Sequence, residues 1–255
     1  MIRPAYEEVK KLAQEGRYKT VPVSMEILSD IRTPIEVLRI LKRVSTHCYL
    51  LESVVESEKW GRYTFLGFDP KMELTCKDGI MKAGSICFHT DSPKTYIRQI
   101  LEEYKSPRFG YLPAFAGGLV GYFSYDYLKY AEPVLDLNAK DTEDFKDLDL
   151  MLFDKVIAFD NFRQKIILIA NMFLKDGEAG YNEAVLKLKQ MKDLIQKGAA
   201  GDPEPGRLTS EIVPLFKKEE YCSMVERAKR HIREGDIFQI VLSNRLEAGF
   251  EGSLL

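Results

Sequence analysis

Hydrophobic and polar residues follow two periods along this chain, one typical of helices and one typical of strands. Apolar residues recur every three or four positions in five segments, which predicts helices over residues 4–15, 30–44, 93–104, 178–197 and 219–234. Within the second segment, Thr33 is placed to cap the helix, Pro34 takes the first helical position and Glu36 completes a capping-box pattern. Gly16 and Gly235 predict the C-terminal ends of the first and last helices.

Runs rich in β-branched and aromatic residues predict strands, most of them in hairpins. Residues 48–55 and 63–68 flank the loop "ESEKWG", and "KMELTCKDG" with "IMKAGSICF" predicts more sheet, with a turn at Asp78 and Gly79. The runs at 150–160 and 164–173 form a further hairpin around "NFR", and residues 236–247 predict a last strand. Because hairpins outnumber strand-helix-strand units, the pattern predicts an α+β fold with antiparallel sheets.

One stretch lacks any periodicity. In "GAAGDPEPGR", residues 198–207, glycine, alanine and proline predict a linker. We therefore expect an amino-terminal domain over residues 1–200 and a second region over 207–255, which is too short to be a complete domain.

Two polar residues, Glu52 and Ser53, interrupt the apolar run at 48–55. Both faces of this run are mostly apolar, so we expect both to be covered and Glu52 to need a cationic partner. Arg62 is the nearest candidate in sequence. Two interpretations remain open: a structural pair between Glu52 and Arg62, or a pocket for an amino acid, which needs an anion for its ammonium group and a cation for its carboxylate.

Composition excludes several classes of function. Lys and Arg total 37 against 39 Asp and Glu, so no overall basic charge attracts nucleic acid or an anionic membrane. No apolar run reaches membrane-spanning length and no secretory signal is present, so we expect a cytoplasmic protein. Cysteine and histidine spacing predicts reduced thiols and no zinc site.

Three ordered stretches resemble the large subunit of the anthranilate synthase family, component I. "LLESVVESEKWGRYTFLG" is similar to its amino-terminal signature, "GGLVGYFSYDY" to its glycine-aromatic strand, and "AKRHIREGDIFQIVLSNR" to the opening of its chorismate-binding domain. The resemblance implies an α+β fold with antiparallel sheets in a sandwich and helices outside. It also implies that residues 1–200 form a regulatory, tryptophan-binding domain and that 207–255 begin an incomplete catalytic domain.

The resemblance also implies site residues. In that family the "LLES" segment lies in the allosteric site where tryptophan inhibits, which makes Ser53 the expected tryptophan contact, Glu52 its neighbour and Arg62 the basic residue on the adjacent strand, with Lys59 as an alternative cation. Gln239 is the substrate-side candidate: relatives that add water to chorismate commonly have a lysine base at this position, whereas a nucleophile such as ammonia needs none. From periodicity alone, Gln239 is a polar strand residue bonded to backbone.

The implied reaction joins chorismate and ammonia with the help of Mg2+ and releases pyruvate, which gives anthranilate, the first intermediate of tryptophan biosynthesis. The family's catalytic groups and Mg2+ ligands match no residue here, so we expect this chain alone to be inactive. The ammonia comes from a separate glutamine amidotransferase subunit, which is the implied partner. Two alternatives remain: the large subunit of an aminodeoxychorismate synthase, and a non-catalytic amino-acid-binding or scaffold module.

Overall fold

The computed structural model describes residues 1–53, 61–132, 134–135, 141–201 and 204–255. The chain divides into two compact units, Met1–Gly201 and Asp202–Leu255. The division falls inside the stretch expected to be a linker. The regulatory and catalytic roles expected for the two regions stay predictions.

The larger sheet of the first unit has six strands among the described residues. Every neighbouring pair is antiparallel. In spatial order the strands are β1 (Ile2–Arg3), β2 (Thr20–Leu28), β11 (Lys165–Phe173), β10 (Lys155–Asp160), β4 (Tyr63–Phe68) and β3 (Cys48–Leu51). The expected hairpin around "NFR" is β10 and β11, paired from Lys155 opposite Ala170 to Asp160 opposite Lys165.

The smaller sheet has five antiparallel strands among the described residues. In spatial order they are β7 (Ile86–His89), β6 (Ile80–Ala83), β5 (Met72–Lys77), β9 (Leu148–Phe153) and β8 (Gly118–Phe123). The turn expected at Asp78 and Gly79 joins β5 to β6, and both residues have positive φ, 47° and 77°, as a two-residue hairpin turn requires. The α+β class with antiparallel sheets and flanking helices is therefore confirmed.

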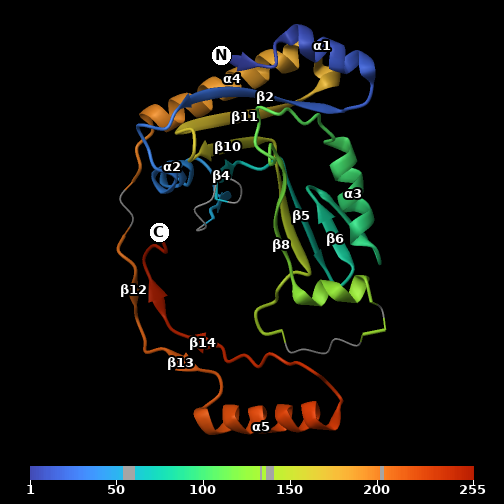
Figure 1. Ribbon diagram of the computed structural model, residues 1–255, viewed down its shortest axis with the longest axis vertical. Helices are drawn as coiled ribbons and strands as arrows, with labels where there is room; N and C mark the ends of the chain where they lie inside the picture. Colours follow the sequence, from blue (N-terminus) through green and yellow to red (C-terminus); the bar gives the residue numbers. More distant parts are fainter. Residues whose placement is uncertain (54–60, 133, 136–140, 202–203) are drawn as a thin grey trace. The chain divides into compact units, whose positions relative to one another are not determined.

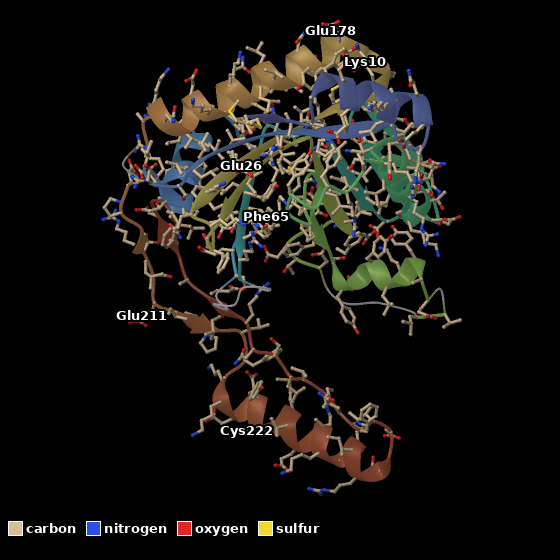
Figure 2. The ribbon with its side chains drawn as sticks, turned by 45° about the horizontal axis from the view of Figure 1, so that its top comes forward. Lys10, Glu26, Phe65, Glu178, Glu211 and Cys222 are labelled. Carbon is tan, nitrogen blue, oxygen red and sulfur yellow. The ribbon has the colours of Figure 1, made fainter. Side chains whose placement is uncertain are left out.

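Helices cover one face of the larger sheet, as Figure 1 shows for α1 and α4. The helices on this face are α1 (Tyr6–Glu15), α2 (Pro34–Leu41) and α4 (Gly177–Lys197). Their apolar faces meet the sheet in a buried core that includes Val9, Leu41 and Leu188. Figure 2 shows Lys10 of α1 beside Glu178 at the start of α4, where the two helices pack together.

The smaller sheet packs against α3 (Pro93–Glu103), beside which it lies in Figure 1. Tyr96, Ile97 and Ile100 of this helix pack against a buried cluster that includes Leu74 and Met81. The short 3-10 helices η1 (Tyr125–Tyr130) and η2 (Leu174–Asp176) follow β8 and β11. No helix in the described ranges has both the length and the apolar character needed to cross a bilayer.

Local sequence signals define most helix ends. Gly16 ends α1 in the left-handed region at φ 65°, and the Thr33 hydroxyl caps α2 by accepting a hydrogen bond of 3.2 Å from the Glu36 amide. The second half of the expected capping box differs, because the Glu36 carboxylate pairs with Arg32 instead of the cap backbone. Arg32 also reaches the carbonyl of Gly198 and so connects α2 to the end of α4.

One expected strand is two strands. Residues 150–160 were expected to form a single strand, but β9 belongs to the smaller sheet and β10 to the larger, with a bend at Asp154 between them. Side-chain periodicity continues through such a bend, which is why the pattern alone does not reveal it.

The second unit contains one long helix and short strand pairs. They are α5 (Lys218–Glu234), β12 (Arg207–Leu208) with β15 (Phe250–Glu251), and β13 (Val213–Pro214) with β14 (Leu246–Glu247). The helix ends at Gly235 as expected. The strand expected over residues 236–247 is wrong except for its last two residues, because a strand needs a hydrogen-bonded neighbour and the described part of this unit offers one only to β14.

Candidate functional site

Glu52 and Ser53 lie just after the end of β3, in an exposed segment. The strand expected over residues 48–55 ends at Leu51, so the expectation of a buried Glu52 carboxylate is wrong. The physical reason is that β3 is an edge strand of the larger sheet, and Leu51 itself is already 46% exposed. Lys59, the alternative cation, lies outside the described residues.

Arg62 binds a different carboxylate from the one expected. Its Nε and Nη2 donate to the two oxygens of Asp160 at 3.0 and 2.6 Å, and the amide of Arg163 donates to the same carboxylate at 3.1 Å. The expected pair between Glu52 and Arg62 is thus replaced by a pair across β4 and β10. Burial raises the pKa of Asp160, but the hydrogen bonds from Arg62 and Arg163 outweigh it and hold this pKa below its ordinary value.

Aromatic side chains gather beside the end of β3. The ring of Tyr49 lies 4.7 Å from that of Phe153 and 6.3 Å from that of Phe115, which in turn lies 5.6 Å from Phe65. Burial raises the pKa of Tyr49, whose hydroxyl is enclosed without a hydrogen-bond partner in the described structure. Tyr49, Phe65 and Phe115 are half-buried, and Phe65 lies opposite Leu51, the residue before the exposed Glu52 and Ser53. A binding site for an aromatic amino acid requires such an apolar surface together with polar groups.

Gln239 belongs to the second unit, so the structure does not bring it together with Ser53 in one compact unit. It is exposed in an irregular segment between Phe238 and Val241, which are 94% and 83% exposed. The neighbouring Asn244 has a structural role, since its side-chain amide accepts from the amide and donates to the carbonyl of Phe216, both at 2.9 Å.

A cavity of about 640 Å³ lies elsewhere in the first unit, between the end of α3, residues 106–118, and the bend at Asp154. The sequence patterns did not predict it. Asp154 is only 4% exposed, and Asn171 of β11 lies beside it on the cavity wall. One signal was present, namely an acidic residue in the middle of the apolar run "LMLFDKVIAFD".

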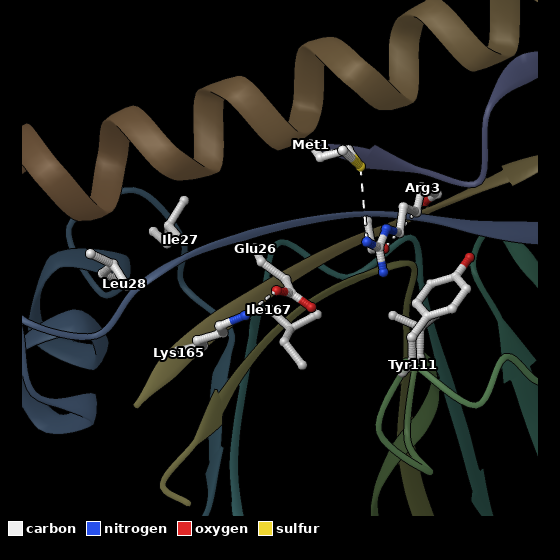
Figure 3. Close-up of a pocket in the computed structure, with 10 residues that line it drawn as sticks. Met1, Arg3, Glu26, Ile27, Leu28, Tyr111, Lys165 and Ile167 are labelled. Atoms are coloured by element: carbon white, nitrogen blue, oxygen red, sulfur yellow. Dashed lines mark hydrogen bonds and ion pairs between the residues drawn. The ribbon is translucent and has the colours of Figure 1, made fainter. Parts of the chain in front are cut away.

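A smaller hollow of about 260 Å³ lies over β2 and β11 (Figure 3). Its charged groups are already engaged with one another or with a ring: Lys165 pairs with Glu26 at 2.7 Å, and the Arg3 guanidinium lies 5.7 Å from the centre of the Tyr111 ring. Burial raises the pKa of Tyr111 to about 12. The hollow therefore offers a ligand fewer free polar groups than the larger cavity.

The described residues offer one group that could hold a metal ion, His231, Glu234 and Asp236 at the end of α5. The His231 ring already bonds Asp236 at 2.8 Å. Mg2+ prefers an octahedron of oxygen ligands, so an exposed group that includes an imidazole does not fit the ion expected from the resemblance.

Comparison with known proteins agrees with the motifs. The sequence model of the family described as chorismate binding enzyme matches residues 46–255. Anthranilate synthase component 1 of Aquifex aeolicus is 35% identical over 97% of this chain and 51% of its own length, and that of Acetivibrio thermocellus is 32% identical over 96% and 51%. The crystal structure of anthranilate synthase component I from Streptococcus pneumoniae superimposes with a TM-score of 0.62 at 25% identity, covering 89% of this chain and 50% of that one.

The chain thus spans about half the length of the curated relatives it matches. The resemblance to the amino-terminal portion of anthranilate synthase component I is confirmed by these relatives. Because the family model covers residues 46–255, more than three quarters of the chain, the protein belongs to the family of chorismate binding enzymes.

Proposed function

We propose that this chain is the amino-terminal half of an anthranilate synthase large subunit, which converts chorismate and ammonia into anthranilate and pyruvate. One observation carries the proposal: nearly the whole chain aligns with relatives named anthranilate synthase component 1. Gln239 supports amination rather than hydration, because a neutral amide has no basic group to deprotonate water. By this proposal the ammonia comes from a glutamine amidotransferase partner.

The chemical step belongs to residues outside this chain. The group His231, Glu234 and Asp236 does not suit Mg2+. By this proposal, the ion that would neutralise the chorismate carboxylate is held by the other half of the enzyme. This chain contributes a first unit with buried cores. Its second unit contributes the polar Gln239. We expect no turnover by the chain alone.

We further propose that tryptophan regulates the enzyme by binding at Glu52 and Ser53. The exposed Glu52 carboxylate suits the ligand's ammonium group, and the Ser53 hydroxyl suits its carboxylate. The role of Arg62 changes: because Asp160 engages its guanidinium, Arg62 fixes β4 next to this site rather than binding the effector directly.

One assay, run without and with tryptophan, tests the proposed reaction and the proposed regulation. The chain is incubated with chorismate, ammonia and Mg2+, alone and together with a polypeptide that carries the second half of a component 1 relative. We expect anthranilate only from the combination. Turnover by the chain alone would refute the assignment, and formation of aminodeoxychorismate would favour the alternative enzyme.

The same assay with added tryptophan tests the effector site. Ser53→Ala should raise the half-inhibitory tryptophan concentration about fivefold, the effect of one lost hydrogen bond. Ser85→Ala, which changes an exposed serine between β6 and β7, is the matched control and should leave the half-inhibitory tryptophan concentration unchanged. Equal inhibition of the Ser53 variant and the unchanged protein would refute the effector site while leaving the catalytic assignment intact.

A further inference from the structure

The cavity beside Asp154 has the size of a small-ligand site, about 640 Å³. We call it the Asp154 cavity. About half of its wall is apolar, and this part comes from Leu101, Phe109, Phe153 and the Tyr104 ring, together with prolines and alanines of residues 106–118. The other half is polar and includes Thr20, Ser106, Arg108, Asp154 and Asn171. Polar groups next to an apolar surface can orient a ligand.

Among the described residues, no group donates a hydrogen bond to the buried carboxylate of Asp154. Its Oδ1 is enclosed and has no partner in the described structure. Its Oδ2 lies 3.5 Å from the Lys71 ammonium and 3.8 Å from that of Lys187, both longer than the roughly 2.8 Å of a charge-assisted hydrogen bond. Lys187 instead binds Glu183 at 2.8 Å. The charge of Asp154 is compensated, but its oxygens still lack donors, which is costly in a buried site.

Asn171 places a second acceptor on the same wall. Its Nδ2 donates to the carbonyl of Ala116 at 2.7 Å and to that of Asp154 at 3.1 Å, so both amide hydrogens are used. The Oδ1 is therefore fixed as an acceptor without a partner among the described residues. Gly117 permits this arrangement, because a Cβ at that position would lie 2.6 Å from the Asn171 Nδ2.

Charged side chains line both the Asp154 cavity and a smaller hollow next to it. A smaller hollow of about 140 Å³ shares Asp154 and Asn171 with it and is also lined by two lysines and the acidic Asp176 and Glu183, so the charged side chains there sum to −1. Arg108 is the cation on the wall of the Asp154 cavity. It is exposed and has no ion-pair partner in the described ranges.

We propose that the Asp154 cavity binds an α-amino acid with an apolar side chain, with its ammonium group at Asp154 and Asn171 and its carboxylate at Arg108. An ammonium group supplies the donors that the two acceptors lack, and the apolar half of the wall accommodates the side chain. This site is separate from the proposed effector site, because neither Glu52 nor Ser53 lines the cavity.

Calorimetric titration of the 255-residue chain tests the proposal. The probes are L-phenylalanine and L-leucine, with phenethylamine, which lacks the carboxylate, and 3-phenylpropanoate, which lacks the ammonium group. At least one of the two amino acids should bind saturably, phenethylamine about tenfold more weakly than phenylalanine, and 3-phenylpropanoate still more weakly. If neither amino acid binds, or if 3-phenylpropanoate binds as tightly as phenylalanine, the proposal is overturned.

Two variants test whether Asp154 binds the ammonium group of the ligand and Arg108 its carboxylate. Asp154→Asn keeps the side-chain shape and should weaken amino-acid binding about tenfold or more. If that variant does not fold, Arg108→Ala changes an exposed residue and still decides the question: it should weaken binding of the amino acid about tenfold and leave phenethylamine unchanged. Unchanged amino-acid binding by Arg108→Ala overturns the proposed orientation.

Ser53→Ala separates this site from the effector proposal. It should leave the affinity measured in this titration unchanged, whatever its effect on tryptophan inhibition. A loss of binding by Ser53→Ala would place the titrated ligand at the effector site and refute the Asp154 cavity as its location.

Discussion

Acidic residues within apolar runs have different fates in this protein. Glu52 stands in such a run and is exposed, whereas Asp154 and Asp160 stand in similar runs and are 4% and 1% exposed. The difference is the position of the strands in their sheets. Glu52 follows β3, an edge strand, whereas Asp160 ends β10 and Asp154 lies between β9 and β10, both of which are paired on two sides. Burial of a single residue therefore depends on strand order, which its neighbours in sequence do not reveal.

Asp160→Asn should destabilise the first unit by about 2 kcal/mol at pH 7, because it removes a charge-assisted pair with Arg62 at a buried side chain. The pKa of Asp160 lies below its ordinary value of 3.8 in the folded state. Its stabilisation is thus complete above about pH 3.8 and is lost as the pH falls through the lower, folded pKa. Urea unfolding at several pH values should show that the difference in free energy of unfolding between the unchanged protein and Asp160→Asn becomes smaller below pH 3.8.

Asp193→Asn is the matched control, because it breaks the exposed pair between Asp193 and Lys197 of α4. We expect a change below about 0.5 kcal/mol. If Asp160→Asn and Asp193→Asn had equal effects at pH 7, the pair with Arg62 would contribute no more than a surface pair.

At the scale of elements, glycines interrupt the aromatic run that forms β8, and the pairing of β8 with β9 explains one of them. A Cβ on Gly121 would lie 1.9 Å from the carbonyl oxygen of Asp149 and 2.9 Å from the Cα of Leu150. These are backbone atoms of the neighbouring strand, so they have little freedom to move away. The glycine allows the two strands to approach closely, as interior strand glycines commonly do.

Gly121→Ala should therefore push β8 away from β9 and lower the free energy of unfolding by about 2 kcal/mol, the usual range for overpacking. Gly110→Ala is the control, since a Cβ there meets no atom within 4 Å. Urea unfolding followed by circular dichroism measures both variants. If neither Gly121→Ala nor Gly110→Ala changed the free energy of unfolding, β8 would be able to shift without losing its pairing with β9.

At the scale of the whole molecule, buried apolar residues are concentrated in the first unit. The three buried clusters found among the described residues all lie between Val9 and Ile195. Ala228 is the buried hydrophobic residue of the second unit in the described ranges. The first unit has the cores of an independently folding domain, and the second does not.

A polypeptide of residues 1–201 should consequently unfold cooperatively, with a midpoint within about 4 °C of that of the 255-residue chain. Differential scanning calorimetry of the two polypeptides measures this. Cys76 and Met81 in the smaller-sheet core should stay as protected from labelling as they are in the longer chain. Loss of cooperative unfolding in the shorter polypeptide would show that residues 202–255 stabilise the first unit.

Local signals in the sequence determined the helices and hairpins. The Thr33 cap, the glycines after α1 and α5, and the Asp78–Gly79 turn depend on contacts within a few residues, so reading them needs no knowledge of the fold. The α+β class and the family membership also followed from the sequence, because hairpin order and long motifs are properties of the chain itself.

Only the tertiary structure decided which strands share a sheet and which polar groups meet. Residues 150–160 are divided between two sheets, and Glu52 is exposed. Arg62 pairs with Asp160, which is 98 residues away in sequence. Residues 236–245 form no strand. The tertiary structure also forms the Asp154 cavity from segments between Thr20 and Asn171. These outcomes depend on pairing between distant segments, and a period of two or 3.6 residues carries no information about which segments will pair.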